Sequence, residues 1–195
     1  MARRKRGKHT PSIRTAHQQA QRNNEVLYGL GAILILVALV LFLVFHNSES
    51  RSSAAGPPRM GKPAPIITLT DLNGNRVSLA DFEGQVVLVN FWATWCPPCK
   101  AEMPDIQRLY EEFASQGFTV LSIDMEESPQ AVAQFRDVYG LTFPIAIDPQ
   151  GSVNPAYAIR GLPTSWLVDK KGVLRYIWTG RINTPDIERR IRDLL

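Results

Sequence analysis

The chain has 195 residues, of which 45% are hydrophobic and 21% charged, so it can bury one core of ordinary size and is not globally disordered. Its net charge is +4, but residues 1–25 carry seven Lys/Arg and one acid, Glu25, which leaves residues 26–195 with a net charge of −2. A nucleic-acid-binding domain needs a basic face, and this distribution argues against one.

Residues 26–45 form a continuous apolar run without a charged side chain. As a helix rising about 1.5 Å per residue, the run spans the roughly 30 Å hydrocarbon core of a bilayer, so it is expected to be a transmembrane helix. The basic segment 1–25 is then a cytoplasmic tail by the positive-inside rule, and the rest of the chain lies outside the cytoplasm. The alternatives are a buried core helix for the apolar run and a nucleic-acid-binding arm for segment 1–25.

A cleaved signal peptide is the main alternative to an uncleaved signal anchor, because Ser53-Ala54-Ala55 has the small residues of a cleavage site. The apolar run exceeds the roughly 7–15 residues of a signal-peptide core, which favours the anchor. Both interpretations export the domain. The expected product is a single-pass protein of the cell membrane with an extracytoplasmic domain.

Residues 46–60 are rich in Ser, Ala, Gly and Pro and are expected to be a flexible linker before one domain, residues 61–195. Within this domain, strand patterns alternate with helix patterns, which predicts an α/β fold with a mixed central sheet flanked by helices. The expected elements are a hairpin over 66–79 turning at Asn73-Gly74, buried strands over 85–92 and 118–124, a helix over 97–115 stopped by Gly117, a helix over 129–139 capped by Ser128, a short strand over 143–147, a short helical segment over 152–158, a hairpin over 164–178, and a final helix from Thr184.

Cys96 and Cys99 are the only cysteines, and they lie where the strand over 85–92 leads into the helix over 97–115. The first turn of a helix has unpaired N–H groups and a partial positive charge, which stabilise a thiolate. Such a site lowers a cysteine pKa from about 8.5 into a range of roughly 3.5–7.5. We expect Cys96, which precedes the helix, to be the more exposed nucleophile, and Cys99, one turn in, to resolve the mixed disulfide.

Other chemistries fit the sequence poorly. The three histidines, His9, His17 and His46, all precede the domain, so it holds no Ser–His–Asp or Cys–His site. Two thiolates without imidazole are a poor match to structural zinc, and no metal or other cofactor is expected. Lys100 stands where a c-type haem attachment motif needs His.

The segment Phe91 to Lys100, FWATWCPPCK, resembles the active site of thioredoxin-fold proteins. Further matches are Gly61-Lys62-Pro63-Ala64-Pro65, the continuation to Pro104, and Gly161-Leu162-Pro163-Thr164-Ser165. Together they resemble the TlpA/ResA-like family of membrane-anchored extracytoplasmic thioredoxins over roughly residues 60–195. The resemblance implies a thioredoxin-like fold, with the long segment 122–148 as the central insertion of this group.

The resemblance also implies roles for single residues. Pro163 matches the family's cis-proline, which sits against the dithiol and leaves the preceding backbone free to pair with substrate. Glu102 matches an acid that tunes the ionisation of the cysteines; an exposed first-turn glutamate is the alternative. Asn90 replaces the buried aspartate of cytosolic thioredoxins and cannot titrate, so that role is missing or moves to Glu102.

The expected substrate groove lies around the dithiol. Trp95 is the tryptophan expected to line it, whereas Trp92 and Trp166 are expected in the core. The other residues expected in the groove are Pro97, Pro98, Leu162 and Thr164.

The function expected from these features is a protein-disulfide reductase for exported proteins. The resemblance implies apocytochrome c, in cytochrome c maturation, as the first substrate to test, and a membrane thiol-electron transporter as the source of electrons. The alternatives are a disulfide-forming oxidase, a peroxiredoxin and a metal-binding thiol module. Peroxidases need Thr or Ser three residues before the reactive cysteine, but Ala93 holds that place before Cys96.

Overall fold

The computed structural model describes residues 36–39 and 57–195, with the side chains of residues 155 and 156 left aside. The chain divides into two units, Met1–Ser52 and Ser53–Leu195. Residues 36–39 form a single helical turn in the first unit. Among the described residues no helix is both long and apolar enough to cross a bilayer, and the predicted span 26–45 lies outside them apart from those four.

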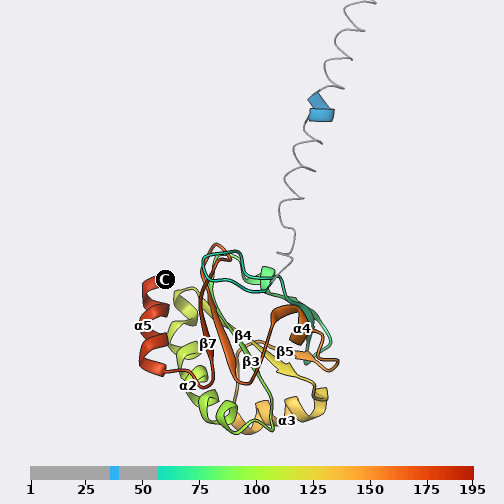
Figure 1. Ribbon diagram of the computed structural model, residues 1–195, viewed down its shortest axis with the longest axis vertical. Helices are drawn as coiled ribbons and strands as arrows, with labels where there is room; N and C mark the ends of the chain where they lie inside the picture. Colours follow the sequence, from blue (N-terminus) through green and yellow to red (C-terminus); the bar gives the residue numbers. More distant parts are fainter. Residues whose placement is uncertain (1–35, 40–56) are drawn as a thin grey trace, which may run out of the picture. The chain divides into compact units, whose positions relative to one another are not determined.

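The second unit is built on a seven-stranded mixed sheet in the order β2-β1-β5-β4-β3-β6-β7 (Figure 1). The central strands β3, β4 and β5 are parallel, and each outer pair is an antiparallel hairpin whose inner strand, β1 or β6, runs antiparallel to the central strand beside it. The strands are β1 (Thr68–Asp71), β2 (Arg76–Ser78), β3 (Val86–Trp92), β4 (Phe118–Met125), β5 (Ile145–Asp148), β6 (Thr164–Val168) and β7 (Leu174–Thr179).

Strands β3 and β4 are buried over their whole lengths because helices or loops cover both faces of the sheet. Alternate residues of a strand point to opposite faces, so each strand feeds two separate apolar clusters. On β3, Val86, Leu88 and Trp92 join the larger cluster. We call the side of the sheet that carries this cluster the dithiol face, because Cys96 and Cys99 belong to it, and the other side the opposite face.

Within residues 57–195, three α-helices cover the dithiol face, and one short α-helix lies on the opposite face. Helices α2, α3 and α5 each begin with Pro at the first or second position after a capping side chain, from Cys96, Ser128 and Asn183 respectively. The helices are α2 (Pro97–Phe113), α3 (Pro129–Tyr139), α4 (Val153–Tyr157) and α5 (Thr184–Leu194). The strong amphipathic pattern of α5 buries Ile187 and Ile191.

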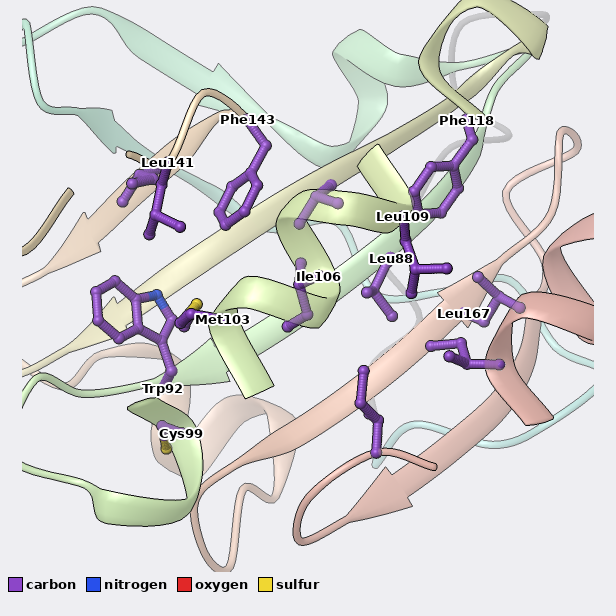
Figure 2. Close-up of a cluster of buried hydrophobic side chains, with 14 of the residues drawn as sticks. Leu88, Trp92, Cys99, Met103, Ile106, Leu109, Phe118, Leu141, Phe143 and Leu167 are labelled. Carbon is purple, nitrogen blue, oxygen red and sulfur yellow. The ribbon is translucent and has the colours of Figure 1, made fainter. Parts of the chain in front are cut away.

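Figure 2 shows the core of the dithiol face, in which side chains of α2 pack onto the sheet. Met103, Ile106 and Leu109 are fully buried and recur at helical spacing along α2. The indole of Trp92 packs against Phe135 of α3 with ring centroids 4.7 Å apart. This packing fixes the start of α2, and therefore the dithiol, against the end of β3.

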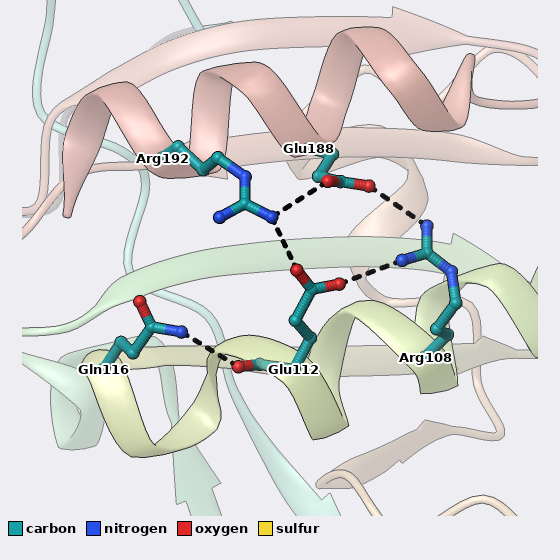
Figure 3. Close-up of polar contacts among 5 residues, drawn as sticks. All are labelled: Arg108, Glu112, Gln116, Glu188 and Arg192. Carbon is teal, nitrogen blue, oxygen red and sulfur yellow. Dashed lines mark hydrogen bonds and ion pairs between the residues drawn. The ribbon is translucent and has the colours of Figure 1, made fainter.

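Helices α2 and α5 are also joined on their outer surfaces by a network of ion pairs (Figure 3). Arg192 of α5 pairs with both Glu112 and Glu188, while Arg108 of α2 pairs with the same two carboxylates. Each arginine pairs with one carboxylate on its own helix and one on the other helix, so the network orients α5 along α2. Because these groups are solvent-exposed, each pair adds little stability.

The expected order of elements is confirmed, including the mixed sheet flanked by helices. Gly117 and Gly140 adopt left-handed conformations; Gly117 ends the 3₁₀ turn 114–116 that follows α2, and Gly140 ends α3. Two features were not predicted. Residues 79–82 form a 3₁₀ helix with a capping box between Ser78 and Asp81, and the first hairpin joins the central sheet through β1 and β5.

Candidate functional site

The dithiol lies at the carboxyl end of β3, at the point where the chain turns into α2. Cys96 is the N-cap residue of α2, with extended backbone, and Cys99 is in its first turn. The side chain of Cys96 accepts a hydrogen bond from the Cys99 N–H at 3.3 Å. A helix N-terminus with a free N–H aimed at sulfur stabilises negative charge on that sulfur. The structure therefore favours a thiolate on Cys96 when the pair is reduced.

Cys96 and Cys99 are joined by a disulfide, with Cα atoms 5.3 Å apart. Cys96 is 3% exposed and Cys99 is fully buried. Cys96 is therefore the more exposed of the two cysteines, as predicted, but the difference in exposure is small in this oxidised form. Lys100, Pro97 and Pro98 around the pair are exposed. Attack on Cys96 is thus possible from the solvent side, whereas Cys99 is reached only from within the protein.

Glu102 is fully buried beneath the start of α2, not exposed as a first-turn glutamate on the outer face. One carboxylate oxygen accepts a hydrogen bond from Asn90 Nδ2 at 2.9 Å, and the other accepts one from the backbone N–H of Ile182 at 3.0 Å. Burial raises the pKa of Glu102, and its two hydrogen bonds and Arg181 only partly offset this effect. The carboxyl can therefore hold a proton at a higher pH than an ordinary glutamate.

Asn90 connects Glu102 to the neighbouring strand. Its amide nitrogen also donates to the Ser165 hydroxyl at 2.9 Å, so a single NH₂ group binds both side chains. Ser122 of β4 is the register partner of Asn90 and is fully buried. Residues on three strands and one helix thus form a polar layer directly below the dithiol turn.

The peptide bond between Leu162 and Pro163 is cis, which confirms the predicted conformation. Pro163 is buried and precedes Thr164, the register partner of Phe91 at the carboxyl end of β3. This register brings the proline to the same end of the sheet as the dithiol. Its carbonyl accepts from Gly180 N–H, while the Leu162 backbone makes no hydrogen bond within residues 57–195. Leu162 is thus free to pair with an extended segment of another protein.

The predicted groove residues differ in accessibility. Trp95 is 65% exposed, and Leu162 is half-buried. Thr164 is buried, and its hydroxyl donates to the Gly161 carbonyl at 2.7 Å, so its side chain supports the loop. Trp92 and Trp166 are buried in the core, as predicted.

Sequence reasoning missed three polar residues beside the dithiol turn. Both the backbone N–H and the hydroxyl of Thr94 donate to Glu127, in the loop after β4. Asp124, three residues earlier, is fully buried. Its place at the end of an apolar strand is a weak signal, because a charged residue there is typical of an ordinary strand end. Across residues 36–39 and 57–195, no three His, Cys, Asp or Glu side chains are grouped so that they could hold a metal ion.

A sequence profile described as the AhpC/TSA family matches residues 60–177. The chain is 38% identical over 162 residues to the thiol-disulfide oxidoreductase ResA of Geobacillus kaustophilus, which covers 83% of this chain and 91% of that protein. It is 34% identical over 182 residues to ResA of Oceanobacillus iheyensis, which covers 91% of this chain and 93% of that protein.

The fold is similar to the crystal structure of a thiol:disulfide interchange protein of the thioredoxin family from Chlorobium tepidum. The TM-score is 0.63 with 29% sequence identity, and the match covers 71% of this chain and 99% of the other. The match therefore shows a thioredoxin-like fold.

Proposed function

Because the chain belongs to the AhpC/TSA family and is a thiol–disulfide oxidoreductase of the ResA type, we propose that it reduces disulfides in exported proteins through Cys96 and Cys99. The observation that carries this proposal is the dithiol at the N-terminus of α2, with a backbone N–H aimed at the Cys96 sulfur. It supports Cys96 as the attacking thiolate. Ala93 argues against a peroxiredoxin reaction.

The exchange proceeds in two steps. The Cys96 thiolate attacks one sulfur of the substrate disulfide, which forms a mixed disulfide and releases the other substrate sulfur as a thiolate. The Cys99 thiolate then attacks the Cys96 sulfur, which breaks the mixed disulfide and releases the second substrate thiolate. Two electrons pass to the substrate, and the protons leave the enzyme's thiols and end on the substrate's thiols.

Glu102 is proposed as the group that accepts the proton of the Cys99 thiol and returns it. Residues three apart on a helix are neighbours, so Glu102 lies on the same stripe of α2 as Cys99. Its raised pKa, which burial causes, suits a group that takes up and returns a proton. The non-titrating Asn90 holds its carboxylate in place.

The substrate is proposed to lie in extended form across Leu162 and Trp95. The unpaired backbone of Leu162 supplies hydrogen bonds, and the exposed indole of Trp95 supplies apolar contact. Recognition by backbone pairing is tolerant of sequence. An unfolded apocytochrome c, with its two haem-attachment cysteines oxidised, is the first substrate proposed for test.

Membrane attachment through residues 26–45 and an extracytoplasmic position of the domain belong to the same proposal. The apolar run and the seven basic residues before it support both. An enzyme in this place needs electrons from the cytoplasm, so a membrane thiol-electron transporter is the proposed partner.

The direction of electron flow is tested by the reduction potential of the Cys96–Cys99 pair, measured in glutathione redox buffers. A reductase should have a potential close to that of thioredoxin, about −270 mV. A value near about −120 mV, as in a strong oxidase, would make the disulfide-forming alternative the correct one.

Protease digestion of intact cells and of permeabilised cells tests the proposed location, because an extracytoplasmic domain is cut in both.

A further inference from the structure

Asp124 is the penultimate residue of β4 and lies on the dithiol face, where it is the register partner of Trp92. The residue is fully buried. Neither of its carboxyl oxygens has a well-formed hydrogen bond within residues 57–195, although the nearby backbone N–H of Glu127 lowers its pKa to some extent. A buried carboxylate with so little hydrogen bonding is strongly disfavoured, because little replaces the water that it loses. Protonation removes that cost, so Asp124 is held as the neutral acid.

The neutral acid has a partner in Glu127, which lies in the loop after β4. The Glu127 side chain interacts with that of Asp124 and raises its pKa. Two neighbouring carboxyl groups can share a hydrogen bond only if one of them carries a proton. Burial first, and then Glu127, raise the pKa of Asp124 to about 8. The proton is therefore retained at neutral pH and lost in mildly alkaline solution.

Glu127 in turn holds the active-site loop. Its carboxylate accepts from both the N–H and the hydroxyl of Thr94, two residues before Cys96. The contacts form a chain from a buried acid, through a second carboxylate, to the loop that carries the nucleophile. None of these three residues belongs to the polar layer around Glu102. Glu102 itself binds Asn90 and Ile182.

The other titratable groups near Asp124 are engaged elsewhere. Asp148 of β5 also raises the pKa of Asp124, but its oxygens accept from Ser152 and Val153 at the start of α4. The Glu126 carboxylate lies against Gly151, whose missing Cβ would be 2.6 Å from it. Helix α2 brings Glu102 and Cys99 to the dithiol face, on which Asp124 also lies. Trp92 of β3 and Phe135 of α3 are aromatic residues of this face.

We propose that Asp124 is a positioning residue for thiol–disulfide exchange, whose protonated carboxyl binds Glu127 and thereby fixes Thr94 and the loop that presents Cys96. When Asp124 loses its proton, two carboxylates repel each other in a buried space and Glu127 releases Thr94. The loop then loosens, and a new negative charge beside it disfavours the Cys96 thiolate. The Cys96 reactivity should therefore show a second titration in addition to that of the thiol itself.

The first experiment measures alkylation of Cys96 by iodoacetamide in the full-length chain in detergent, in a Cys99→Ala background, from about pH 5 to about pH 10. Two titration steps are expected with Asp124 present, and one with Asp124→Asn. Below about pH 6 the rates should agree, because the amide donates to Glu127 as the protonated acid does. Asp137→Asn, which removes an exposed carboxylate on α3, is the matched control and should keep both steps.

Two results overturn the proposal: an Asp124→Asn profile that keeps both steps, or a loss of reactivity in this variant already at the lowest pH.

A second measurement uses unsubstituted protein, so it does not depend on the folding of a variant. With ¹³C-carboxyl-labelled aspartate, one resonance should titrate with a pKa of about 8. Aspartate resonances that all titrate in the ordinary acidic range also contradict the proposal.

The inference rests on exchange by Cys96 and not on the proposed direction of electron flow. A potential typical of an oxidase would end the reductase proposal and leave both titration experiments unaffected. Conversely, a single titration step would remove the role of Asp124 without changing the potential. The two failures are therefore distinguishable.

Discussion

In the carboxyl-terminal halves of β3 and β4, the two faces of the sheet differ in their side chains. The opposite face continues with apolar residues, such as Phe91 and Ile123, whereas the dithiol face carries the polar Asn90, Ser122 and Asp124 beside Trp92. Both faces are equally buried. The contrast separates two tasks within the same strands: one face stabilises the fold, and the other holds titratable groups beneath the dithiol.

The largest effect is expected from Cys96→Ala. This variant should lose thiol–disulfide exchange entirely, because Cys99 is fully buried and cannot attack a substrate disulfide itself. Its thermal unfolding should change little, since Cys96 and Cys99 close only a short loop. Turnover of a disulfide-containing peptide measures the first effect and circular dichroism the second. Residual turnover would place the nucleophile elsewhere.

Phe91→Ala should show the reverse pattern on the opposite face. Phe91 is fully buried and packs edge-on against Trp166 with ring centroids 5.0 Å apart. Its truncation should lower the free energy of unfolding by about 3–5 kcal/mol, through lost burial and the resulting cavity. Exchange per folded molecule should stay at the level of the original protein. If exchange fell in parallel, the two faces would not be separable.

Asp124→Asn should change the pH dependence of stability. The pKa of Asp124 is raised from 3.8 in the unfolded chain to about 8 in the folded one. Between these values the folded protein binds a proton that the unfolded chain releases, so stability falls as pH rises, by at most about 1.4 kcal/mol per pH unit. The Asn variant lacks this slope.

Denaturant unfolding at about pH 5 and about pH 8 checks this prediction. The Asn variant should gain stability relative to the original protein as pH rises through that interval. Curves that stay parallel would mean that Asp124 is already ionised in the folded state.

Glu102→Gln is expected to have a smaller effect, confined to thiol ionisation. Glu102 is one turn from Cys99 on the buried stripe of α2, and its carboxylate opposes a second negative charge nearby. The amide removes that charge, so the pKa of the Cys99 thiol should fall by about one unit. Thiolate absorbance of the Cys96→Ala/Glu102→Gln protein, compared with Cys96→Ala alone, measures the shift. An unchanged or higher thiol pKa would contradict the role proposed for Glu102.

The sequence was sufficient for most of the fold because each strand and helix carries its own local signal. Ser128 and Pro129 start α3, and Gly117 ends the helical segment before β4, through capping and left-handed backbone that need no tertiary information. The 3₁₀ turn at 79–82 was missed because its capping box is short and lies within the predicted hairpin.

The site was predictable only where local spacing or resemblance indicated it. Cys96 and Cys99 follow from their place between strand and helix, and Pro163 from the resemblance. The burial of Glu102 also has a local signal, since it shares the helical spacing of Cys99, Met103 and Ile106. By contrast, the interactions of Glu127 with Asp124 and with Thr94 depend on the register of β3 and β4, which no local pattern in the sequence reveals.

The most direct test of the exchange mechanism is covalent trapping with Cys99→Ala. Without the resolving thiol, the mixed disulfide between Cys96 and a substrate cannot be released, so a stable adduct that a reducing agent cleaves is expected. Cys96→Ala, treated in the same way, should give none. Mass spectrometry of the purified adducts identifies the linked cysteine. Adducts on Cys99 in the Cys96→Ala protein, with none on Cys96 in the Cys99→Ala protein, would reverse the assignment of the nucleophile.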